Sequence, residues 1–292
     1  MQGKIIKGVG GFYYVHVPGD GEYECRARGI FRKEKVKPLP GDMVRISITS
    51  IPDREGSIDS ILPRKNQMIR PACANIDQVI LMFAAADPEP NFNLIDRFLL
   101  SMRKAGIPVT LIFNKSDLAD PEKLEAYRDI YRDCGAELLF TCVSRQEGIE
   151  RVRQCMDGKT SILAGPSGVG KSSLTNLLSG AQQMEVGQIS RKIGRGRHTT
   201  RHTQLIWVWE NTYLMDTPGF STLYLEDIVY EELPSLYREF EPCESTCRFP
   251  GCMHLAEPDC GVKQAVDKGD ISSVRYNNYV LIAKELGERR KY

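Results

Sequence analysis

The sequence predicts a three-part α/β protein, with a small all-β barrel before a mostly parallel α/β domain and a short helical domain after it. Three observations predict this class. Short strand-like runs fill residues 1–70, apolar strands alternate with amphipathic helices over 71–222, and four cysteines cluster within 223–292. Strands that alternate with helices are typical of parallel sheets covered by helices. We therefore expect domain boundaries near residues 70 and 222.

The first 70 residues are expected to form an OB-like barrel. The strand-like runs, separated by Gly, Pro and Asp, cover residues 12–17, 22–28, 43–49 and 57–61. Barrels of this kind offer an open face and loops that suit single-stranded or folded RNA. The basic stretch RKEKVK is compatible with such a face, as are the aromatic residues Phe12, Tyr13, Tyr14 and Tyr23. The alternative is that these aromatic residues form the barrel core and the lysines are merely solvated.

The composition indicates a soluble, cytoplasmic chain. The longest apolar run, residues 79–86, is too short to span a bilayer, and the N-terminus lacks a signal peptide pattern. Nine cysteines, an odd number, fit poorly with a disulfide framework. The 39 basic and 38 acidic residues are segregated, with 13 basic against 8 acidic in residues 1–70 and 5 against 2 in 191–222. These local basic surfaces suit phosphate backbones.

The middle part is expected to place its ligands at the carboxyl ends of parallel strands. The expected strands cover residues 79–86, 108–113, 137–142, 160–164, 205–209 and 213–216. A helix is expected over 94–106, closed by Gly106, and a short turn joins the last two strands. In the last part, residues 226–240 and 263–287 are expected to be helical.

A phosphate cradle is indicated by GPSGVGKS, which matches G-x-x-x-x-G-K-[ST] between an expected strand and an expected helix. Its glycines let backbone N–H groups surround phosphate oxygens. Lys171 is expected against the β- and γ-phosphates, and the Ser172 hydroxyl is expected to ligate Mg²⁺. The residues expected to line the nucleotide here are Gly165, Pro166, Ser167, Gly168, Val169, Gly170, Lys171, Ser172 and Ser173.

Guanine recognition is indicated by NKSD at residues 114–117, directly after a strand. Asn114 is expected to bond the N7 edge of the base, Lys115 to lie along the ring, and Asp117 to accept hydrogen bonds from N1–H and N2–H. Adenine lacks both donors, so Asp117 would select GTP over ATP because an unpaired buried carboxylate is costly. The residues expected to reach the guanine carbonyl through their backbone, in the TCVS loop, are Cys142, Val143 and Ser144.

The motif DTPG at residues 216–219 is expected to sense the γ-phosphate from the end of a strand. Asp216 would hold the Mg²⁺ shell, and the Gly219 N–H would meet the γ-phosphate. The stretch DREG at residues 53–56 fits the same D-x-x-G pattern. Only DTPG follows a strand of the α/β part, and its position separates the two.

A second sensor is expected in the basic stretch over residues 190–202, which lies between the cradle and DTPG. Either Thr199 or Thr200 is placed to close on Mg²⁺ and the γ-phosphate as a switch does. The alternative is a solvated basic loop without such a role. Adjacent threonines, two glycines and the position between two phosphate motifs favour the switch.

The catalytic group for hydrolysis is not the usual one. Ras-type enzymes place a water-orienting Gln after D-x-x-G, but Phe220 stands at that position here. His198, beside the switch threonines, is the available replacement, although a lone loop His is usually only solvated. The expected catalytic set is therefore His198, Lys171 and Thr200, with hydrolysis slow until a partner assists.

A structural zinc site is indicated by CESTCRFPGCMHLAEPDC. Three thiolates and one imidazole suit a tetrahedral, closed site formed by Cys247, Cys252, His254 and Cys260. A Cys₄ site that includes Cys243 and leaves out His254 is the alternative. Neither set implies an open coordination position.

Together, the barrel and the motifs NKSD, GPSGVGKSS, GRGRHTT, DTPGF and C-x₄-C-x-H-x₅-C, in that order, closely resemble the circularly permuted ribosome-biogenesis GTPases of the RsgA (YjeQ/YloQ) family. The resemblance implies an OB-fold, a GTPase domain in which the base reader precedes the cradle and both switches, and a zinc domain. It also implies GTP hydrolysis stimulated by the small ribosomal subunit and its rRNA. By the same resemblance the four zinc ligands leave out Cys243, and His198 takes part in hydrolysis.

Two other classes of function compete with this interpretation. One is a nucleotide-gated module that scaffolds RNA without needing hydrolysis, in place of the GTPase, which is expected to be a monomer. The other is a P-loop ATPase or small-molecule kinase in which NKSD is accidental. Hydrolysis that responds to small subunits separates the first class from the GTPase, and the choice between GTP and ATP separates the second.

Overall fold

The computed structural model describes residues 1–29, 31, 36–69, 71–183, 204–216, 225 and 227–290. Its contacts group the chain into two compact units, each built from segments distant in the sequence. The first unit holds Met1–Val79, Glu150–Ala164 and the described residues of 171–219; the second holds Ile80–Ile149, Gly165–Gly170 and the described residues from 225 on. The three expected domains, which follow chain order, stay a prediction.

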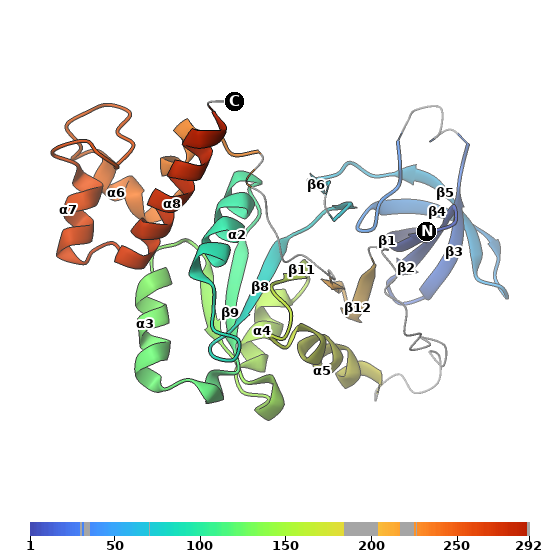
Figure 1. Cartoon of the computed structure of the whole chain (residues 1–292). Coiled ribbons are helices and arrows are strands. Elements are labelled where there is room, and N and C mark those ends of the chain that lie inside the picture. The colour runs from blue at the N-terminus through green and yellow to red at the C-terminus, as the bar shows by residue number, and fades with distance from the viewer. Residues whose placement is uncertain are drawn as a thin grey trace. The chain divides into compact units, whose positions relative to one another are not determined.

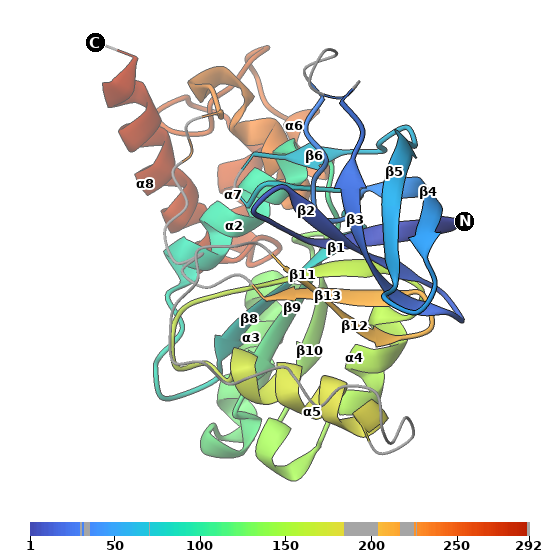
Figure 2. The same ribbon diagram turned by 90° about the vertical axis from the view of Figure 1, so that its right-hand side faces the viewer.

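A closed barrel opens the first unit and confirms the expected OB-like fold. Its strands are β1 (Gln2–Val9), β2 (Phe12–Val17), β3 (Gly21–Ala27), β4 (Met43–Ser50) and β5 (Glu55–Ile61). Their order is β1-β2-β3-β5-β4, with β3 and β5 parallel and the other registered pairs antiparallel, as Figures 1 and 2 show in blue. Sequence reasoning missed β1, because its glycines and lysines obscure the alternation of strands.

The barrel aromatics divide between core and surface. Tyr23 is buried with Ile5, Val15, Val44 and Ile58 in the barrel core, and Tyr13 packs against them. Two further aromatics, each half-buried, lie under cations: Arg26 over the ring of Phe12 and Lys7 over the ring of Tyr14. The core alternative is therefore correct for Tyr23 and Tyr13, whereas an RNA-binding role for Phe12 and Tyr14 stays a prediction. The stretch DREG lies at the turn that leads into strand β5 of the barrel. It does not follow a strand of the α/β part, so its position does not suit a phosphate sensor.

A six-stranded sheet carries the α/β part, in the order β10-β9-β8-β11-β13-β12. The strands are β8 (Gln78–Ala84), β9 (Val109–Asn114), β10 (Glu137–Phe140), β11 (Thr160–Ala164), β12 (Leu205–Trp209) and β13 (Thr212–Asp216). Pairs β9/β10 and β11/β13 are parallel, whereas β12 and β13 form an antiparallel hairpin. A small pair, β6 (Gln67–Met68) and β7 (Cys73–Ala74), lies between the barrel and β8 in the chain. The expected mostly parallel sheet is confirmed.

Helices connect these strands. They are α2 (Phe92–Lys104), α3 (Pro121–Tyr131), α4 (Ile149–Met156) and α5 (Lys171–Gln183), with 3₁₀ turns η1 (Ser116–Leu118) and η2 (Val143–Arg145). Helix α2 begins two residues before its expected start, because the side chain of Asn91 accepts a hydrogen bond from the N–H of Leu94 and caps the helix there. Across the described ranges, no helix combines the length and the apolar character of a membrane span.

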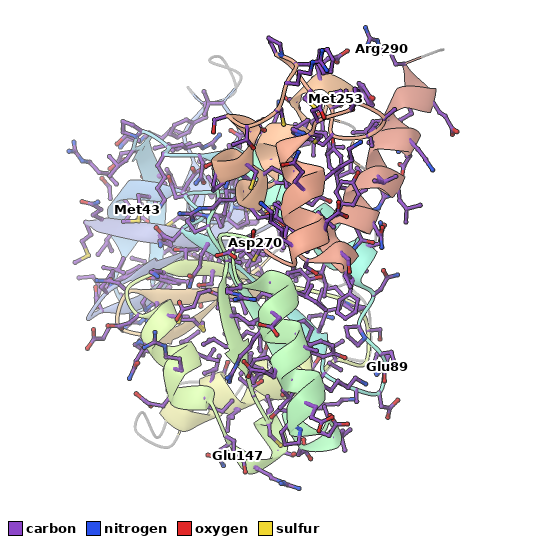
Figure 3. The ribbon with its side chains drawn as sticks, turned by 90° about the vertical axis from the view of Figure 1, so that its left-hand side faces the viewer. Met43, Glu89, Glu147, Met253, Asp270 and Arg290 are labelled. Atoms are coloured by element: carbon purple, nitrogen blue, oxygen red, sulfur yellow. The ribbon has the colours of Figure 1, made fainter. Side chains whose placement is uncertain are left out.

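The C-terminal part is helical, but two expected helices were wrong in detail. Instead of one helix over 226–240 there are 3₁₀ turns η3 (Tyr230–Glu232), η4 (Pro234–Leu236) and η5 (Arg238–Phe240), because Pro234 cannot donate a helical hydrogen bond. The helical stretch after the cysteines is divided at Gly269, which has φ +82°. The remaining helices are α6 (Glu241–Glu244), α7 (Gly261–Lys268) and α8 (Ser273–Arg289), and Figure 3 labels Asp270 in the turn between α7 and α8.

A buried ion cluster joins α8 to α2 within the second unit. Arg275 on α8 is 1% exposed, and its guanidinium donates to the carboxylates of Asp96 on α2 and Glu239 on η5. Asn278, one turn further along α8, donates to the second oxygen of Asp96 at 2.7 Å. The rings of Tyr237 and Tyr131 lie 4.7 and 5.5 Å from the guanidinium carbon. The two ion pairs and the ring contacts of Arg275 define one position of α8 on α2.

We expect Arg275→Ala to lower the free energy of unfolding by about 3–5 kcal/mol, because it leaves two carboxylates buried without their counter-ion. Arg132→Ala removes an exposed i,i+3 ion pair with Asp129 and serves as the control. It is expected to change stability by less than about 0.5 kcal/mol. Urea unfolding of both variants measures the difference, and equal losses would contradict the role given to the buried cluster.

Candidate nucleotide site and metal centre

The phosphate loop follows β11 and owes its shape to three glycines. Gly165, Gly168 and Gly170 have φ of +135°, +81° and +101°, a region that side chains disfavour. At Gly165 a Cβ would also lie 2.0 Å from the carbonyl oxygen of Met82, and at Gly170 it would lie 2.4 Å from Nδ2 of Asn114. The backbone of the loop therefore has the conformation that the motif G-x-x-x-x-G-K-[ST] requires. Helix α5 begins directly after the loop, at Lys171.

The other predicted residues of the cradle include one buried anchor and several exposed positions. Val169 is fully buried and anchors the loop, whereas Ser167 and Gly168 are exposed. Ser172 and Ser173 are also exposed, in the first turn of α5. Such a turn presents backbone N–H groups that have no helical acceptor. A phosphate group is the ligand that this combination suits.

The side-chain amide of Asn114 holds three loops together. Its Nδ2 donates to the carbonyl of Val169 in the phosphate loop at 2.8 Å. Its Oδ1 accepts from the hydroxyl of Thr141 at 3.0 Å and from the N–H of Val143 at 3.1 Å. The residue is only 3% exposed, so each of these bonds is made away from water. NKSD, TCVS and the phosphate loop thus converge, as the motifs predict.

The carboxylate of Asp117 lies in the loop after β9 with 17% of its side chain exposed. A hydrogen bond from the thiol of Cys142 lowers the pKa of Asp117, and the nearby charge of Arg145 lowers it further. The guanidinium of Arg145 is 3.7 Å from Oδ2 of Asp117. Lys115, with φ +58°, turns its ammonium to the carbonyl of Asp87. An ionised acceptor is the form that reads the N1–H and N2–H groups of guanine.

The end of β13 supplies the last described residue of this set. Asp216 is in register with Leu163, the penultimate residue of β11, and the phosphate loop begins two residues later. DTPG therefore starts beside the strand that leads into the cradle. Other predicted site residues, His198, Thr199, Thr200 and Gly219, lie outside the described residues, as does Phe220.

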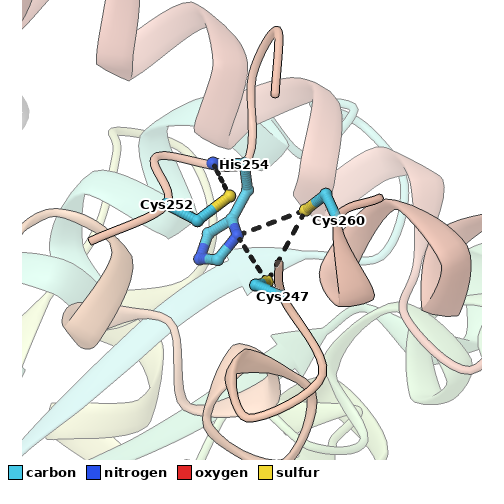
Figure 4. A group of neighbouring side chains, drawn as sticks. All are labelled: Cys247, Cys252, His254 and Cys260. Carbon is cyan, nitrogen blue, oxygen red and sulfur yellow. Dashed lines mark hydrogen bonds between the residues drawn. The ribbon is translucent and has the colours of Figure 1, made fainter. Parts of the chain in front are cut away.

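A second site lies in the loops around α6 and α7. Among the described residues, one group of side chains with metal-ligand atoms stands out: Cys247, Cys252, His254 and Cys260. These atoms all lie within 4.8 Å of one another, and three of the four residues are buried. Figure 4 shows the imidazole of His254 turned with Nδ1 toward the sulfurs of Cys247 and Cys260.

The distances fit a tetrahedral zinc ion. Zinc–sulfur and zinc–nitrogen bonds of ~2.3 and ~2.05 Å at tetrahedral angles place two sulfurs ~3.8 Å apart and a sulfur and a nitrogen ~3.6 Å apart. The Sγ atoms of Cys247 and Cys260 are 3.9 Å apart, and Nδ1 of His254 is 3.6 and 3.3 Å from them. Burial lowers the pKa of His254, which favours the neutral imidazole that metals bind. The cluster is compatible with zinc.

Backbone N–H groups point at two of the sulfurs in the cluster. The N–H of Gly261 donates to Sγ of Cys247 at 3.3 Å, and the N–H of His254 donates to Sγ of Cys252 at 3.4 Å. Such bonds stabilise sulfur that carries negative charge. Cys243 stands outside the group, so the geometry favours the Cys₃His set over the Cys₄ alternative.

Comparison with known proteins places the chain in a family. The family described as RsgA GTPase matches residues 61–226, and the RsgA N-terminal domain matches residues 2–58. The chain belongs to the RsgA GTPase family. As a member of that family it is a GTP-hydrolysing enzyme, and the predicted family resemblance is confirmed.

Relatives in this family match over the full length. The "Small ribosomal subunit biogenesis GTPase RsgA" of Agathobacter rectalis is 49% identical and covers 100% of both chains. The protein of the same name from Alkaliphilus metalliredigens is 43% identical over 100% of this chain and 99% of its own. Among solved structures, YloQ, described as a circularly permuted GTPase, is 37% identical with a TM-score of 0.80 and covers 99% of this chain and 95% of its own. YjeQ from Thermotoga maritima is 34% identical with the same TM-score and covers 98% of each.

Several residues of the RsgA-type site were not found by sequence reasoning. Thr141 and Arg145 flank the predicted backbone contacts, and neither belongs to a motif with a side-chain role. Glu244 lies 3.8 Å from Nε2 of His254, which makes no hydrogen bond within the described part of the chain. That position suits a carboxylate that orients a metal-bound imidazole. No local signal marks these residues, because each acts through a partner brought close by folding.

We expect Asp117→Asn to weaken GTP binding by roughly 100-fold or more and to shift preference toward xanthine nucleotides, because the amide offers a donor where guanine also has one. Nucleotide titration of GTP, XTP and ATP measures this. Asp120→Asn is the control, since Asp120 caps α3 and Asn caps equally well. Unchanged GTP affinity in Asp117→Asn, or tight ATP binding in wild type, would contradict guanine reading.

We expect wild type to bind one zinc ion, and we expect Cys260→Ser to lose it and to unfold at a lower temperature, because structural zinc contributes folding energy. Cys243→Ser, in the same loop region but outside the cluster, is expected to keep both the zinc and the unfolding temperature. Metal content by mass spectrometry and thermal unfolding measure the pair. If Cys243→Ser lost the zinc and Cys260→Ser kept it, the predicted ligand set would be wrong.

Proposed function

We propose that this chain hydrolyses GTP to GDP and phosphate during late maturation of the small ribosomal subunit, and that the subunit's rRNA stimulates the reaction. One observation carries the proposal. The amide of Asn114 joins a guanine-reading loop to a phosphate loop, in a chain 49% identical to a protein named for small ribosomal subunit biogenesis. The two loops bind GTP, and the similarity to that protein indicates that the enzyme acts on the small ribosomal subunit.

The barrel supports binding to rRNA. A pocket of about 320 Å³ on its surface is lined by Tyr13, Phe31, Arg28 and Lys37, among others. Phe31 is buried in the barrel core, so the cations Arg28 and Lys37 are the groups that this pocket offers to backbone phosphates. Arg28 has 57% of its side chain exposed, so it is available to such a ligand despite its ion pair with Asp59. Interaction of this kind weakens as salt rises.

The phosphate side of the site is assigned from the motifs. Lys171 holds the β- and γ-phosphates, and the nucleotide lies along the N–H groups of Gly165–Ser173. Ser172, Asp216 and Thr200 hold Mg²⁺, with Thr199 as the alternative switch residue. When bound, Mg²⁺ neutralises charge on the β- and γ-oxygens. The N–H of Gly219 contacts the γ-phosphate.

Hydrolysis depends on His198 in this proposal. Phe220 follows DTPG where Ras-type enzymes have a Gln that orients the attacking water. His198 orients or deprotonates that water instead. An enzyme that lacks the water-orienting Gln hydrolyses GTP slowly by itself and faster when it is bound to the subunit.

The remaining assignments follow chain order. We infer an RNA-binding OB-fold at 1–70, a GTPase domain at 71–222 with base reader, cradle and switches in permuted order, and a zinc domain at 223–292. One structural zinc ion is bound by Cys247, Cys252, His254 and Cys260. The protein acts in the cytoplasm, as a monomer, on the small subunit.

The proposal predicts that purified small subunits raise the maximal rate of GTP hydrolysis by roughly tenfold or more, because a partner completes the catalytic arrangement. The rate is measured against subunit concentration at fixed, stated salt. Large subunits are the control for non-specific RNA effects.

His198→Ala is expected to bind GTP as wild type does and to lose roughly 100-fold in stimulated turnover, the contribution of a positioned general base.

Three outcomes would contradict parts of this proposal. A rate indifferent to small subunits would exclude the ribosomal role, and equal stimulation by large subunits would exclude its specificity. Subunit binding that depends on nucleotide without any faster turnover would favour a nucleotide-gated scaffold. Unchanged turnover in His198→Ala would exclude its catalytic role.

A further inference from the structure

A buried polar contact ties the barrel to the β12–β13 hairpin within the first unit. Lys4 of β1 and His16 of β2 are directly opposite each other in the barrel register, so their side chains share one face. Trp207 of β12 and Tyr213 of β13 are likewise opposite each other in the hairpin register. The two cross-strand pairs meet: His16 lies 4.9 Å from the Trp207 ring, and its Nδ1 lies 2.8 Å from the hydroxyl of Tyr213.

Lys4 contributes the charge of this contact. Its ammonium lies 4.2 Å from the centroid of the Tyr213 ring and donates to the hydroxyl of Thr160 at 2.5 Å. Burial lowers the pKa of Lys4 to about 8. A further backbone bridge joins Lys7 to Gln204, the residue before β12.

Contacts of this kind define one position. An apolar contact can slide by an ångström at small cost, but a buried hydroxyl, imidazole and ammonium lose their partners when they move. Tyr213 is 1% exposed and His16 is 7% exposed, so water cannot replace those partners without opening the contact. The barrel and the hairpin are therefore either engaged in this register or separated.

The hairpin connects the two segments assigned to the γ-phosphate. Tyr213 precedes Asp216 by three residues on β13, and Leu205 at the start of β12 follows Thr200 by five. We propose that Lys4, His16 and Tyr213 are positioning residues that transmit engagement of the barrel by the small subunit to the hydrolytic segments. This inference rests on the proposed function, and it assigns the route by which the partner stimulates the reaction.

The test distinguishes a loss of stimulation by the subunit from a loss of subunit binding and from a loss of unstimulated GTP hydrolysis. Tyr213→Phe removes the hydroxyl bonded to His16 and keeps the ring under Lys4, whereas Lys4→Met keeps the aliphatic length and removes the ammonium. Both variants are expected to hydrolyse GTP alone, and to reach half-saturation with subunits, within about twofold of wild type. Their maximal stimulated rate is expected to fall by about fivefold or more, the effect of one lost buried hydrogen bond. Arg28→Met, in the barrel pocket, is the contrasting variant, expected to raise the half-saturating concentration at an unchanged maximal rate.

Thermal unfolding of each variant is recorded beside the kinetics, and Tyr213→Phe is the gentler change if Lys4→Met does not fold. Wild-type maximal stimulation in Tyr213→Phe would overturn the inference while leaving the proposed function standing. An equal loss of basal and stimulated rates would also overturn it, because the contact would then only support the hydrolytic site. If wild type itself is not stimulated by small subunits, the proposed function fails and this inference fails with it.

Discussion

The side-chain amide of Asn114 is the interaction on which the nucleotide site depends. Its two ends are bonded to two other loops, through the carbonyl of Val169 in the phosphate loop and through the hydroxyl of Thr141 and the N–H of Val143 in the TCVS loop. Because the amide is buried, a shift of any one loop would leave a polar group without a partner at a cost of about 1–3 kcal/mol. The base-reading loop is therefore placed relative to the phosphate loop before nucleotide arrives. Preorganisation of this kind reduces the entropy that binding must overcome.

The same dependence on a few polar contacts recurs at other places in the chain. Arg275 fixes α8 on α2 through two buried carboxylates, and the cysteine–histidine cluster brings together side chains from the loops around α6 and α7. Lys4, His16 and Tyr213 hold the barrel against the hairpin. Each contact is specific in geometry, so each gives a defined position to elements that are distant in the chain. Under the proposed function such defined positions matter, because a loosely packed contact would not carry a conformational change from a large partner.

Chain order matters less than strand-end position in this fold. The base reader at 114–117 precedes the cradle at Gly165–Ser172, yet Asn114 and Val169 are in direct contact. Parallel strands bring their carboxyl ends to one edge of a sheet whatever their order along the chain. The permuted order leaves DTPG leading toward the C-terminal part, and it leaves the hairpin before DTPG in contact with the barrel.

The sequence by itself determined the motifs, the strand and helix pattern of the α/β part, the barrel and the presence of a cysteine–histidine cluster over residues 243–260, because these depend on local spacing and periodicity. It did not predict β1, where glycines and lysines mask the alternation, or the 3₁₀ turns around Pro234. Only the tertiary structure decided that His254 rather than Cys243 joins the metal group, and that Thr141, Arg145 and Tyr213 have roles at their sites. The physical reason is that these choices rest on distances between residues far apart in the chain, which packing sets and no local pattern records.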